Sequence, residues 1–269
     1  MVSFPHSKIN LGLHVVSKRE DGFHNIETCF YPIPWCDVLE IIPSDTISFT
    51  NTGLSIPGQP EENLCLKAYY LLRDDFDLPS INMHLHKIVP MGAGLGGGSS
   101  DGVNVLIMLN DIFELKLSSD QLAGYSIRLG SDCTFFMHKG PMLGTGRGEI
   151  LSPVSISLKG KFIVVVKPDV HVSTQEAYQG IKPSMPELPL STILTNHSMS
   201  DWQHLLYNDF ERVVFNRYPL VGKIKEQLYI EGAMYSSMSG SGSSVFGIFE
   251  NPIDLQNNFR EYIYWSGSL

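Results

Sequence analysis

The sequence is poor in cysteine and in basic residues, and these shortages exclude several classes of protein. Its four cysteines show no C-x-x-C spacing, which argues against a zinc site and predicts reduced thiols in a cytoplasmic protein. Only 19 lysines and arginines accompany 28 acidic residues, which leaves a net charge of −9. Proteins that bind nucleic acid usually carry a basic patch, so we expect no nucleic-acid partner.

Long apolar runs are missing as well. One of the longest, residues 162–166, is far too short to cross a membrane. Residues 1–6 have neither the charged nor the apolar region of a signal peptide. With 43% apolar and 17% charged residues in a chain of 269, the composition predicts a globular protein of one large or two moderate domains. We expect no membrane partner, and a monomer or a weak homodimer.

Glycine, by contrast, is concentrated in one segment, Pro90-Met91-Gly92-Ala93-Gly94-Leu95-Gly96-Gly97-Gly98-Ser99-Ser100-Asp101. An alternating, strand-like run over 81–89 precedes this glycine loop, and an apolar, helix-like segment begins at Val103. Glycines let backbone N–H groups converge, and a helix N-terminus adds partial positive charge. A single turn needs one or two glycines rather than five in seven positions. The segment therefore predicts a phosphate-binding loop.

The loop formally satisfies the pattern G-x-G-x-x-G, but its context argues against a dinucleotide-binding unit. Such a unit has an acidic residue about 20 positions later at the end of a second strand, whereas Asp111 and Glu114 lie on or at the end of the predicted helix. No Gly-Lys-Ser/Thr sequence completes a Walker loop either. A lysine for phosphate chemistry must come from another segment, and Lys8 and Lys87 are the nearest to the motifs.

Two further segments carry polar residues with possible chemistry. Residues 7–15 alternate as in a half-buried strand, with Lys8, Asn10 and Gly12 on one face, and the pattern alone favours solvent exposure of that face. Behind the turn signal Asp21-Gly22 come Phe23 and His24, which are either surface residues or a pair suited to a flat heterocycle.

Asp132 lies between Ser131 and a strongly apolar stretch. It is either a cap for the following turn or a general base, which requires a carboxylate near a nucleophilic hydroxyl.

The remaining pattern mixes helices and strands in both halves and predicts an α+β protein. A restart of the pattern after Pro153 places a domain boundary near residue 154. We expect helices at 63–74 with Asn63 as cap, at 118–129 with a cap in the run Ser118-Ser119-Asp120-Gln121, and over 201–228; strands at 233–238 and 245–249; a hairpin or loop at 144–149; and a surface loop at 183–189.

In this order the segments resemble the GHMP kinases, the superfamily of galactokinase, homoserine kinase, mevalonate kinase and phosphomevalonate kinase. The resemblance runs nearly end to end and rests on residues 8–11, 21–24, 90–100, 129–136 and 239–246. It implies a ribosomal-S5-like, ATP-binding domain at 1–154, a ferredoxin-like domain at 155–269, and an active site in the cleft between them. The turn at 21–24 points to the branch whose acceptor alcohol carries a cytidine diphosphate.

The resemblance also implies roles for individual residues. Asp132 is expected to be the catalytic base and Lys8 its electrostatic partner near the attacking hydroxyl. The expected ATP contacts are Pro90, Met91, Gly92, Ala93, Gly94, Leu95, Gly96, Gly97, Gly98, Ser99, Ser100 and Asn63, with Mg²⁺ held by Ser99 or Ser100. The expected substrate contacts are Asn10, Phe23, His24, Tyr178, Gly240 and Ser241, with His24 bonded to the cytosine and Phe23 and Tyr178 on its ring faces.

Four positions depart from the family pattern, namely Ala93, Gly102, Lys167 and His171. None is a reacting group, so they bear on the shape of the cytidine pocket rather than on phosphoryl transfer. Two alternatives remain open at this stage. One is another small-molecule GHMP kinase, acting on homoserine or a mevalonate derivative, and the other is a non-catalytic nucleotide-binding protein.

Overall fold

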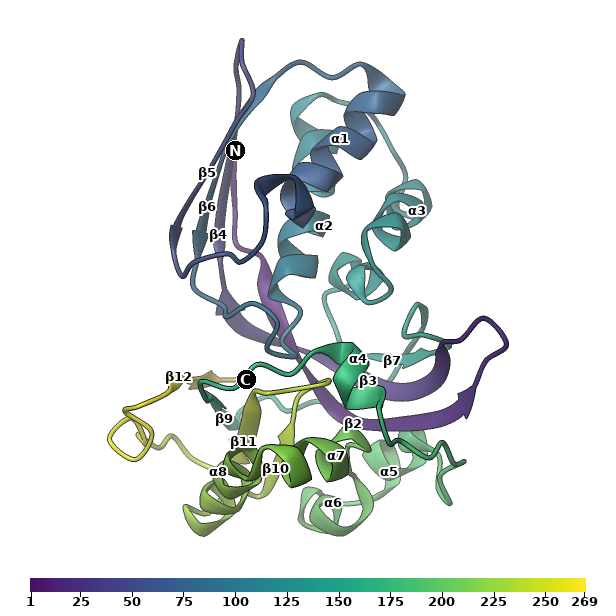
Figure 1. Ribbon diagram of the computed structural model, residues 1–269, viewed down its shortest axis with the longest axis vertical. Helices are drawn as coiled ribbons and strands as arrows, with labels where there is room; N and C mark the ends of the chain where they lie inside the picture. Colours follow the sequence, from purple (N-terminus) through teal and green to yellow (C-terminus); the bar gives the residue numbers. More distant parts are fainter. The chain divides into compact units, whose positions relative to one another are not determined.

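The computed structural model describes all 269 residues, and none of its helices combines the length and apolar character needed to cross a membrane. Contacts divide the chain into two compact units, each assembled from separate stretches of sequence (Figure 1). The first unit comprises Met1–Ser7, Trp35–Met91 and Gly96–Lys139; the second comprises Lys8–Pro34, Gly92–Leu95 and Gly140–Leu269. This division differs from the domain boundary expected near residue 154, and that boundary stays a prediction.

The first unit is a four-stranded sheet with its helices on one face (Figure 1). The strand order is β1 (Val2–Ser3), β4 (Val38–Pro43), β6 (Ile81–Lys87) and β5 (Ser48–Gly53). The helices are α1 (Leu64–Phe76), α2 (Gly97–Ile112) and α3 (Ser119–Leu129), with 3₁₀ turns η1 (Pro60–Glu62) and η2 (Cys133–Met137). Strands β5 and β6 are parallel, and α1 connects them as a crossover. Strand β6 is then followed by the glycine loop and α2, which is the predicted order of strand, loop and helix.

The predicted caps of two helices are confirmed. The Asn63 side chain accepts a hydrogen bond from the backbone N–H of Cys65 at the start of α1. Ser118 and Gln121 form a reciprocal capping box at the start of α3.

Gly102 has a packing role that accounts for its place inside helix α2. A Cβ atom there would lie 3.0 Å from Cβ of Leu64 and 3.2 Å from its carbonyl oxygen. Glycine in a helix costs about 1 kcal/mol relative to alanine. Here that cost accompanies a close approach of α2 to the start of α1, which a larger residue would prevent.

Strand β6 shows the predicted alternation, and it places Lys87 on the buried face. The Lys87 ammonium, 1% exposed, forms ion pairs with Asp37 and with Asp101, the latter at 2.8 Å. Asp37 also accepts hydrogen bonds from the backbone N–H groups of Ile88 and Val89, at 2.5 and 2.8 Å. The cluster thus joins the end of β6 to the first turns of α2, on either side of the glycine loop.

The expectation that Lys87 supplies positive potential to a ligand is therefore wrong, because two buried carboxyl groups already bind its ammonium. Burial alone would lower the pKa of Lys87, but the carboxylates of Asp101 and Asp37 raise it above its usual range. Burial raises the pKa of Asp101 to about 7, against the lowering effect of Lys87.

The second unit contains two further four-stranded sheets, which are built from antiparallel strand pairs. One has the order β10 (Tyr235–Met238), β11 (Val245–Phe249), β9 (Phe162–Lys167) and β12 (Ile263–Ser268). The other has the order β2 (His6–Lys18), β3 (His24–Cys36), β7 (Met142–Thr145) and β8 (Ile150–Pro153), of which the first residues of β2 and the last of β3 belong to the first unit. The helices of the second unit are α4 (Thr174–Tyr178), α5 (Leu190–Asn196), α6 (Met199–Leu205), α7 (Phe210–Arg217) and α8 (Pro219–Ile230).

The single helix predicted over 201–228 is in fact three helices. Residues 206–209, between α6 and α7, run beside β2, where Leu13 N–H donates to the carbonyl of Tyr207 at 3.0 Å. Pro219 then starts α8, because a proline fits the first turn of a helix but not its interior. The sequence pattern did not reveal that this linker bonds to a strand about 195 residues earlier.

Replacement of Lys87 by methionine should destabilise the protein strongly. Lys87→Met leaves Asp37 and Asp101 buried without their cation, which costs about 3–5 kcal/mol. The measurement is the free energy of unfolding from urea denaturation. The matched control is Lys161→Met, which removes an ion pair to the exposed carboxylate of Glu250 and should cost less than about 1 kcal/mol. Equal losses in the two variants would contradict a structural role of the cluster.

Candidate functional site

Lys8 and Asn10 are buried, so the interpretation of their strand face as solvent-exposed is wrong. Their side chains are 4% and 2% exposed. The Lys8 ammonium donates to Oδ1 of Asn10 at 2.6 Å and to the carbonyl of Gly94 at 2.7 Å. Asn10 in turn donates through Nδ2 to the Thr28 hydroxyl at 2.8 Å. A charged ammonium held by two carbonyl-type oxygens has a fixed direction, as a group that acts on phosphate or alkoxide requires.

The glycine loop and the later loop 239–242 are in direct contact within the second unit. The Ser239 hydroxyl donates to the carbonyl of Gly94 at 2.8 Å, and the N–H of Ser244 donates to the carbonyl of Ala93 at 3.2 Å. Gly94 has φ of +78°, and a Cβ atom on it would lie 1.9 Å from the carbonyl oxygen of Ser239. Loop 239–242 is therefore more than a turn between strands.

Helix α2 begins inside the glycine segment, at Gly97. Gly96, with φ of +69°, is its N-cap, and no side chain caps the first turn. The first N–H groups of an α-helix have no partner within the helix. The start of this 16-residue helix therefore offers backbone N–H groups and the positive end of the helix dipole to an anion.

Asp132 precedes η2 without capping it by a side-chain hydrogen bond, so the capping interpretation is wrong. Its Oδ1 instead accepts a hydrogen bond of 3.0 Å from the Ser99 hydroxyl, in the first turn of α2. Ser100 differs from its neighbour, because its hydroxyl is fully buried and has no hydrogen-bond partner. Of the two serines, Ser99 is the one whose hydroxyl lies beside a carboxylate.

The predicted aromatic residues are brought together only in part. The rings of His24 and Tyr178 stack with centroids 4.7 Å apart, so no third ring lies between them. Phe23 is 50% exposed, and the Arg147 guanidinium lies over its ring at 3.8 Å. Burial, followed by the charge of Lys18, lowers the pKa of His24, which favours a neutral imidazole with one donor and one acceptor nitrogen.

The segment 167–178 also lies against the two loops. The Ser243 hydroxyl donates to the carbonyl of Val170 at 2.5 Å, and the hydroxyls of Thr174 and Ser241 are 3.4 Å apart. A Cβ atom on Gly92 would lie 3.4 Å from the imidazole of His171. The segment that carries Tyr178 thus lies next to both loops of the second unit.

Other sequence features carry less chemistry. All four cysteines are free, and burial raises the pKa of Cys29 and of Cys133 to about 12, so neither thiol is a nucleophile at neutral pH. No group of three or more His, Cys, Asp or Glu side chains is placed to hold a metal ion. Asn63 uses its carbonyl oxygen to cap α1, and its contact with a nucleotide base stays a prediction.

Four polar residues with structural contacts were not predicted from the sequence, namely Thr28, Asp37, Asp101 and Asn208, the last of which donates to the carbonyls of Met238 and Gly240. Thr28 and Asp37 show no local signal, because their partners are distant in sequence. Asp101, in the first turns of α2, could have been suspected of balancing Lys87 from the strand before the loop. Asn208 lies in a linker that the pattern assigned to a helix.

The chain is similar to known proteins over its whole length. The family described as GHMP kinases N terminal domain matches residues 63–140, and the one described as GHMP kinases C terminal matches residues 190–263. A protein of Cytophaga hutchinsonii named 4-diphosphocytidyl-2-C-methyl-D-erythritol kinase is 51% identical, over 93% of this chain and 92% of that protein. A protein of the same name from Parabacteroides distasonis is 47% identical over 100% of both chains.

Solved structures show the same likeness. A crystal structure of 4-(cytidine 5′-diphospho)-2C-methyl-D-erythritol kinase has a TM-score of 0.85 at 29% identity, over 100% of this chain and 98% of that one. The mevalonate kinase of Methanococcus jannaschii has a TM-score of 0.72 at 14% identity, over 99% and 96% of the two chains. At that identity the likeness concerns the fold alone.

Replacement of Gly94 by alanine should break the contact between the two loops. The Cβ atom cannot fit 1.9 Å from a backbone oxygen, and a positive φ strains any larger residue, so Gly94→Ala should cost at least about 2 kcal/mol of stability. Urea denaturation measures the loss. The control is Gly124→Ala in α3, where a Cβ atom meets nothing within 4 Å and should stabilise the helix by up to about 1 kcal/mol. A neutral Gly94→Ala variant would contradict the described contact.

Proposed function

The chain belongs to the GHMP kinase family, and we propose that it phosphorylates the 2-hydroxyl of 4-diphosphocytidyl-2-C-methyl-D-erythritol with ATP, in the non-mevalonate route to isoprenoid precursors. The observation that carries the proposal is the Lys8 ammonium, which is buried and fixed on the carbonyl of the glycine loop. A protein that only binds a nucleotide needs the glycine loop but has no reason to keep both Lys8 and Asp132. The near full-length identity to two kinases of that name supports the substrate.

The glycine loop, Pro90 to Ser100, and the start of α2 would hold the ATP phosphates through backbone N–H groups. The Ser99 hydroxyl, whose hydrogen bond of 3.0 Å to Asp132 leaves its lone pairs available, is the proposed contact to Mg²⁺, which binds few protein oxygens and keeps water and phosphate ligands. When bound, the metal neutralises charge on the phosphates. Asn63 is the proposed contact to the nucleotide base.

Two residues would serve the acceptor alcohol. Asp132 would accept the proton of the 2-hydroxyl as general base, and Lys8 would stabilise the developing negative charge on the oxygen. Asn10 supports this role of Lys8, because its Oδ1 accepts one of the ammonium hydrogens. Because Lys8 and Asn10 are both buried, few water molecules compete for the ammonium, which strengthens its electrostatic effect on the oxygen.

The cytidine diphosphate would be recognised within the second unit. We assign His24 to the hydrogen-bonding edge of the cytosine and Phe23 and Tyr178 to its faces, and Gly240 and Ser241 to the phosphates. Because His24 and Tyr178 stack on each other, a base on the stacked face of Tyr178 requires the His24 ring to move aside. The exposed Phe23 ring offers a face without such a movement.

The compartment and the oligomeric state are part of the proposal. Four free cysteines support a reducing compartment, which we take to be the cytoplasm. We propose a monomer or a weak homodimer, to be measured by sedimentation equilibrium.

The substrate is tested by a coupled assay of ADP release with Mg·ATP. The acceptors are 4-diphosphocytidyl-2-C-methyl-D-erythritol and, as controls, homoserine and mevalonate. We expect turnover on the cytidylyl substrate alone, with a product whose new phosphate is located on the 2-hydroxyl by ³¹P NMR. Turnover on a control acceptor alone would support kinase activity and contradict the proposed cytidine pocket. Nucleotide binding without turnover on any acceptor would favour a binding protein.

The role of Asp132 gives a second prediction. Asp132→Asn keeps the size of the side chain but removes the base, so kcat should fall about 10²–10⁴-fold with a small change in KM for ATP. The control is Asp120→Asn, an exposed carboxylate in the first turn of α3, which should leave kcat unchanged. Near-normal kcat in Asp132→Asn would remove Asp132 from the mechanism.

A further inference from the structure

We infer that Asn208 is a positioning residue for Lys8, acting through Ser239 and the carbonyl of Gly94. The effect on catalysis rests on the proposed function, whereas the contacts themselves lie within the second unit and can be tested separately. Asn208 touches none of the groups assigned to ATP or the substrate hydroxyl, and it reaches the loop assigned to the substrate phosphates through the carbonyl of Gly240. Its role is to fix the loop on which the direction of the Lys8 ammonium depends.

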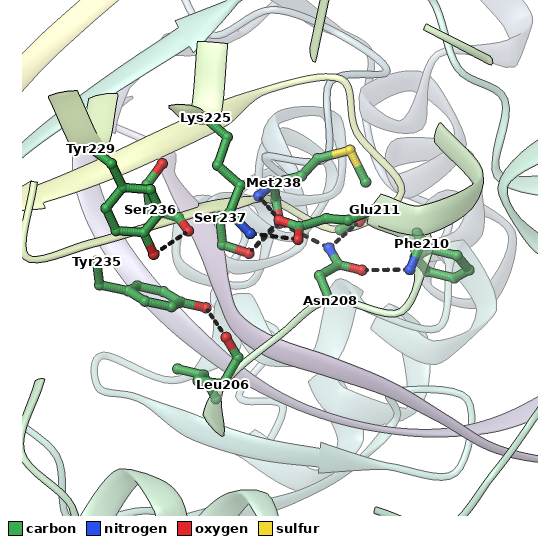
Figure 2. Close-up of polar contacts among 11 residues, drawn as sticks. Leu206, Asn208, Phe210, Glu211, Lys225, Tyr229, Tyr235, Ser236, Ser237 and Met238 are labelled. Atoms are coloured by element: carbon green, nitrogen blue, oxygen red, sulfur yellow. Dashed lines mark hydrogen bonds and ion pairs between the residues drawn. The ribbon is translucent and has the colours of Figure 1, made fainter. Parts of the chain in front are cut away.

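The Asn208 carboxamide is buried and uses both of its ends. It is 3% exposed and lies in the linker between α6 and α7. Its Nδ2 donates to the carbonyl of Met238 at 2.8 Å, while Oδ1 accepts from the N–H of Phe210 at 3.0 Å (Figure 2). Nδ2 also donates to the carbonyl of Gly240 at 2.8 Å. The two bonded carbonyls flank Ser239, so one side chain sets the backbone on both sides of that serine.

Ser239 connects this bracket to Lys8. Its hydroxyl donates to the carbonyl of Gly94 at 2.8 Å, and it lies 3.4 Å from Oδ1 of Asn10 and 3.3 Å from the N–H of Asn10. The Gly94 carbonyl and Asn10 Oδ1 are the same two oxygens that accept hydrogen bonds from the Lys8 ammonium. A shift of Ser239 would therefore move these two acceptors of Lys8 at once.

The linker that carries Asn208 is itself fixed on the strand that carries Lys8. Leu13 in β2 donates to the carbonyl of Tyr207 at 3.0 Å and accepts from the N–H of Asp209 at 2.9 Å. The Asp209 carboxylate accepts from the N–H of Val15 at 2.6 Å. The path from β2 through the linker and loop 239–242 thus returns to β2 and forms a closed ring of contacts. Such a ring leaves little freedom to absorb the loss of one member.

The neighbouring Glu211 has a different task. It accepts hydrogen bonds from the N–H of Met238 at 2.8 Å and the hydroxyl of Ser237 at 3.0 Å, and it pairs with Lys225 at 2.6 Å (Figure 2). These contacts fix the end of strand β10 but do not reach the loop beyond it. Among the residues of Figure 2, Asn208 is the one whose side chain brackets Ser239.

The experiment is a double-mutant cycle of Asn208→Ala and Ser239→Ala. If Asn208 acts through Ser239, each single variant lowers kcat about tenfold or more, because a small displacement of a catalytic group is costly. The double variant then has a kcat close to that of the worse single variant, since the second change removes an interaction already lost. The KM for ATP stays within about threefold of the wild type.

The control variant is Val214→Ala, which opens a cavity in the core of the same unit but removes none of the hydrogen bonds described for the loops. It should lower the melting temperature but leave kcat unchanged at temperatures well below it. Hydrogen exchange supplies a readout that needs no turnover. The N–H groups of Ser244 and Lys8, which bond to the carbonyls of Ala93 and Leu95, should exchange faster in both loop variants but not in Val214→Ala.

Several outcomes would overturn the inference. One is that the kcat losses of the two single variants multiply in the double variant. Another is that Asn208→Ala, like Val214→Ala, lowers the melting temperature but leaves kcat unchanged. The third is unchanged hydrogen exchange at the N–H groups of Ser244 and Lys8. If Asn208→Ala does not fold, Asn208→Ser, which keeps a small donor, takes its place in the cycle. If the wild type turns over no acceptor, the proposed function fails, and hydrogen exchange alone decides whether Asn208 positions the loop.

Discussion

The arrangement of the second unit depends on one backbone oxygen, the carbonyl of Gly94. It accepts hydrogen bonds from the Lys8 ammonium and the Ser239 hydroxyl, whose positions are 231 residues apart in the sequence. Only glycine lets the two loops approach this closely. The direction of the buried cation, the place of loop 239–242 and the end of the glycine loop therefore follow from a single close contact.

The two charged side chains beside the glycine loop are handled in different ways. Lys87 is enclosed between two carboxylates, so its charge serves the structure of the first unit. Lys8 is bonded to the carbonyl oxygens of Asn10 and Gly94, which orient its ammonium. Lys87 therefore ties together the elements on either side of the glycine loop, whereas Lys8 is tied to the loop itself.

Local patterns predicted the elements well and the pairings poorly. The glycine loop, the alternation of β6 and the cap at Ser118 are set by residues close in sequence, and the structure confirms them. The exposure of Lys8 was misjudged because the residues that cover its strand come from distant segments, such as Ser239. The broken helix after residue 205 was missed for the same reason, since its linker bonds to β2. The phosphate-binding role of the glycine loop was predicted from its own residues, and the other catalytic and binding roles were assigned from the family resemblance; all of them stay predictions.

The buried carboxyl of Asp101 has a consequence for the thermodynamics of folding. Burial raises its pKa to about 7, whereas an unfolded chain gives it the ordinary value near 3.8. Between these two values the unfolded chain carries the ionised form and the folded chain keeps the proton, so the protein takes up a proton as it folds. The stability that this group contributes is then present in acid and is lost as the pH rises toward about 7. Part of the measured heat of folding will accordingly belong to the buffer that supplies the proton.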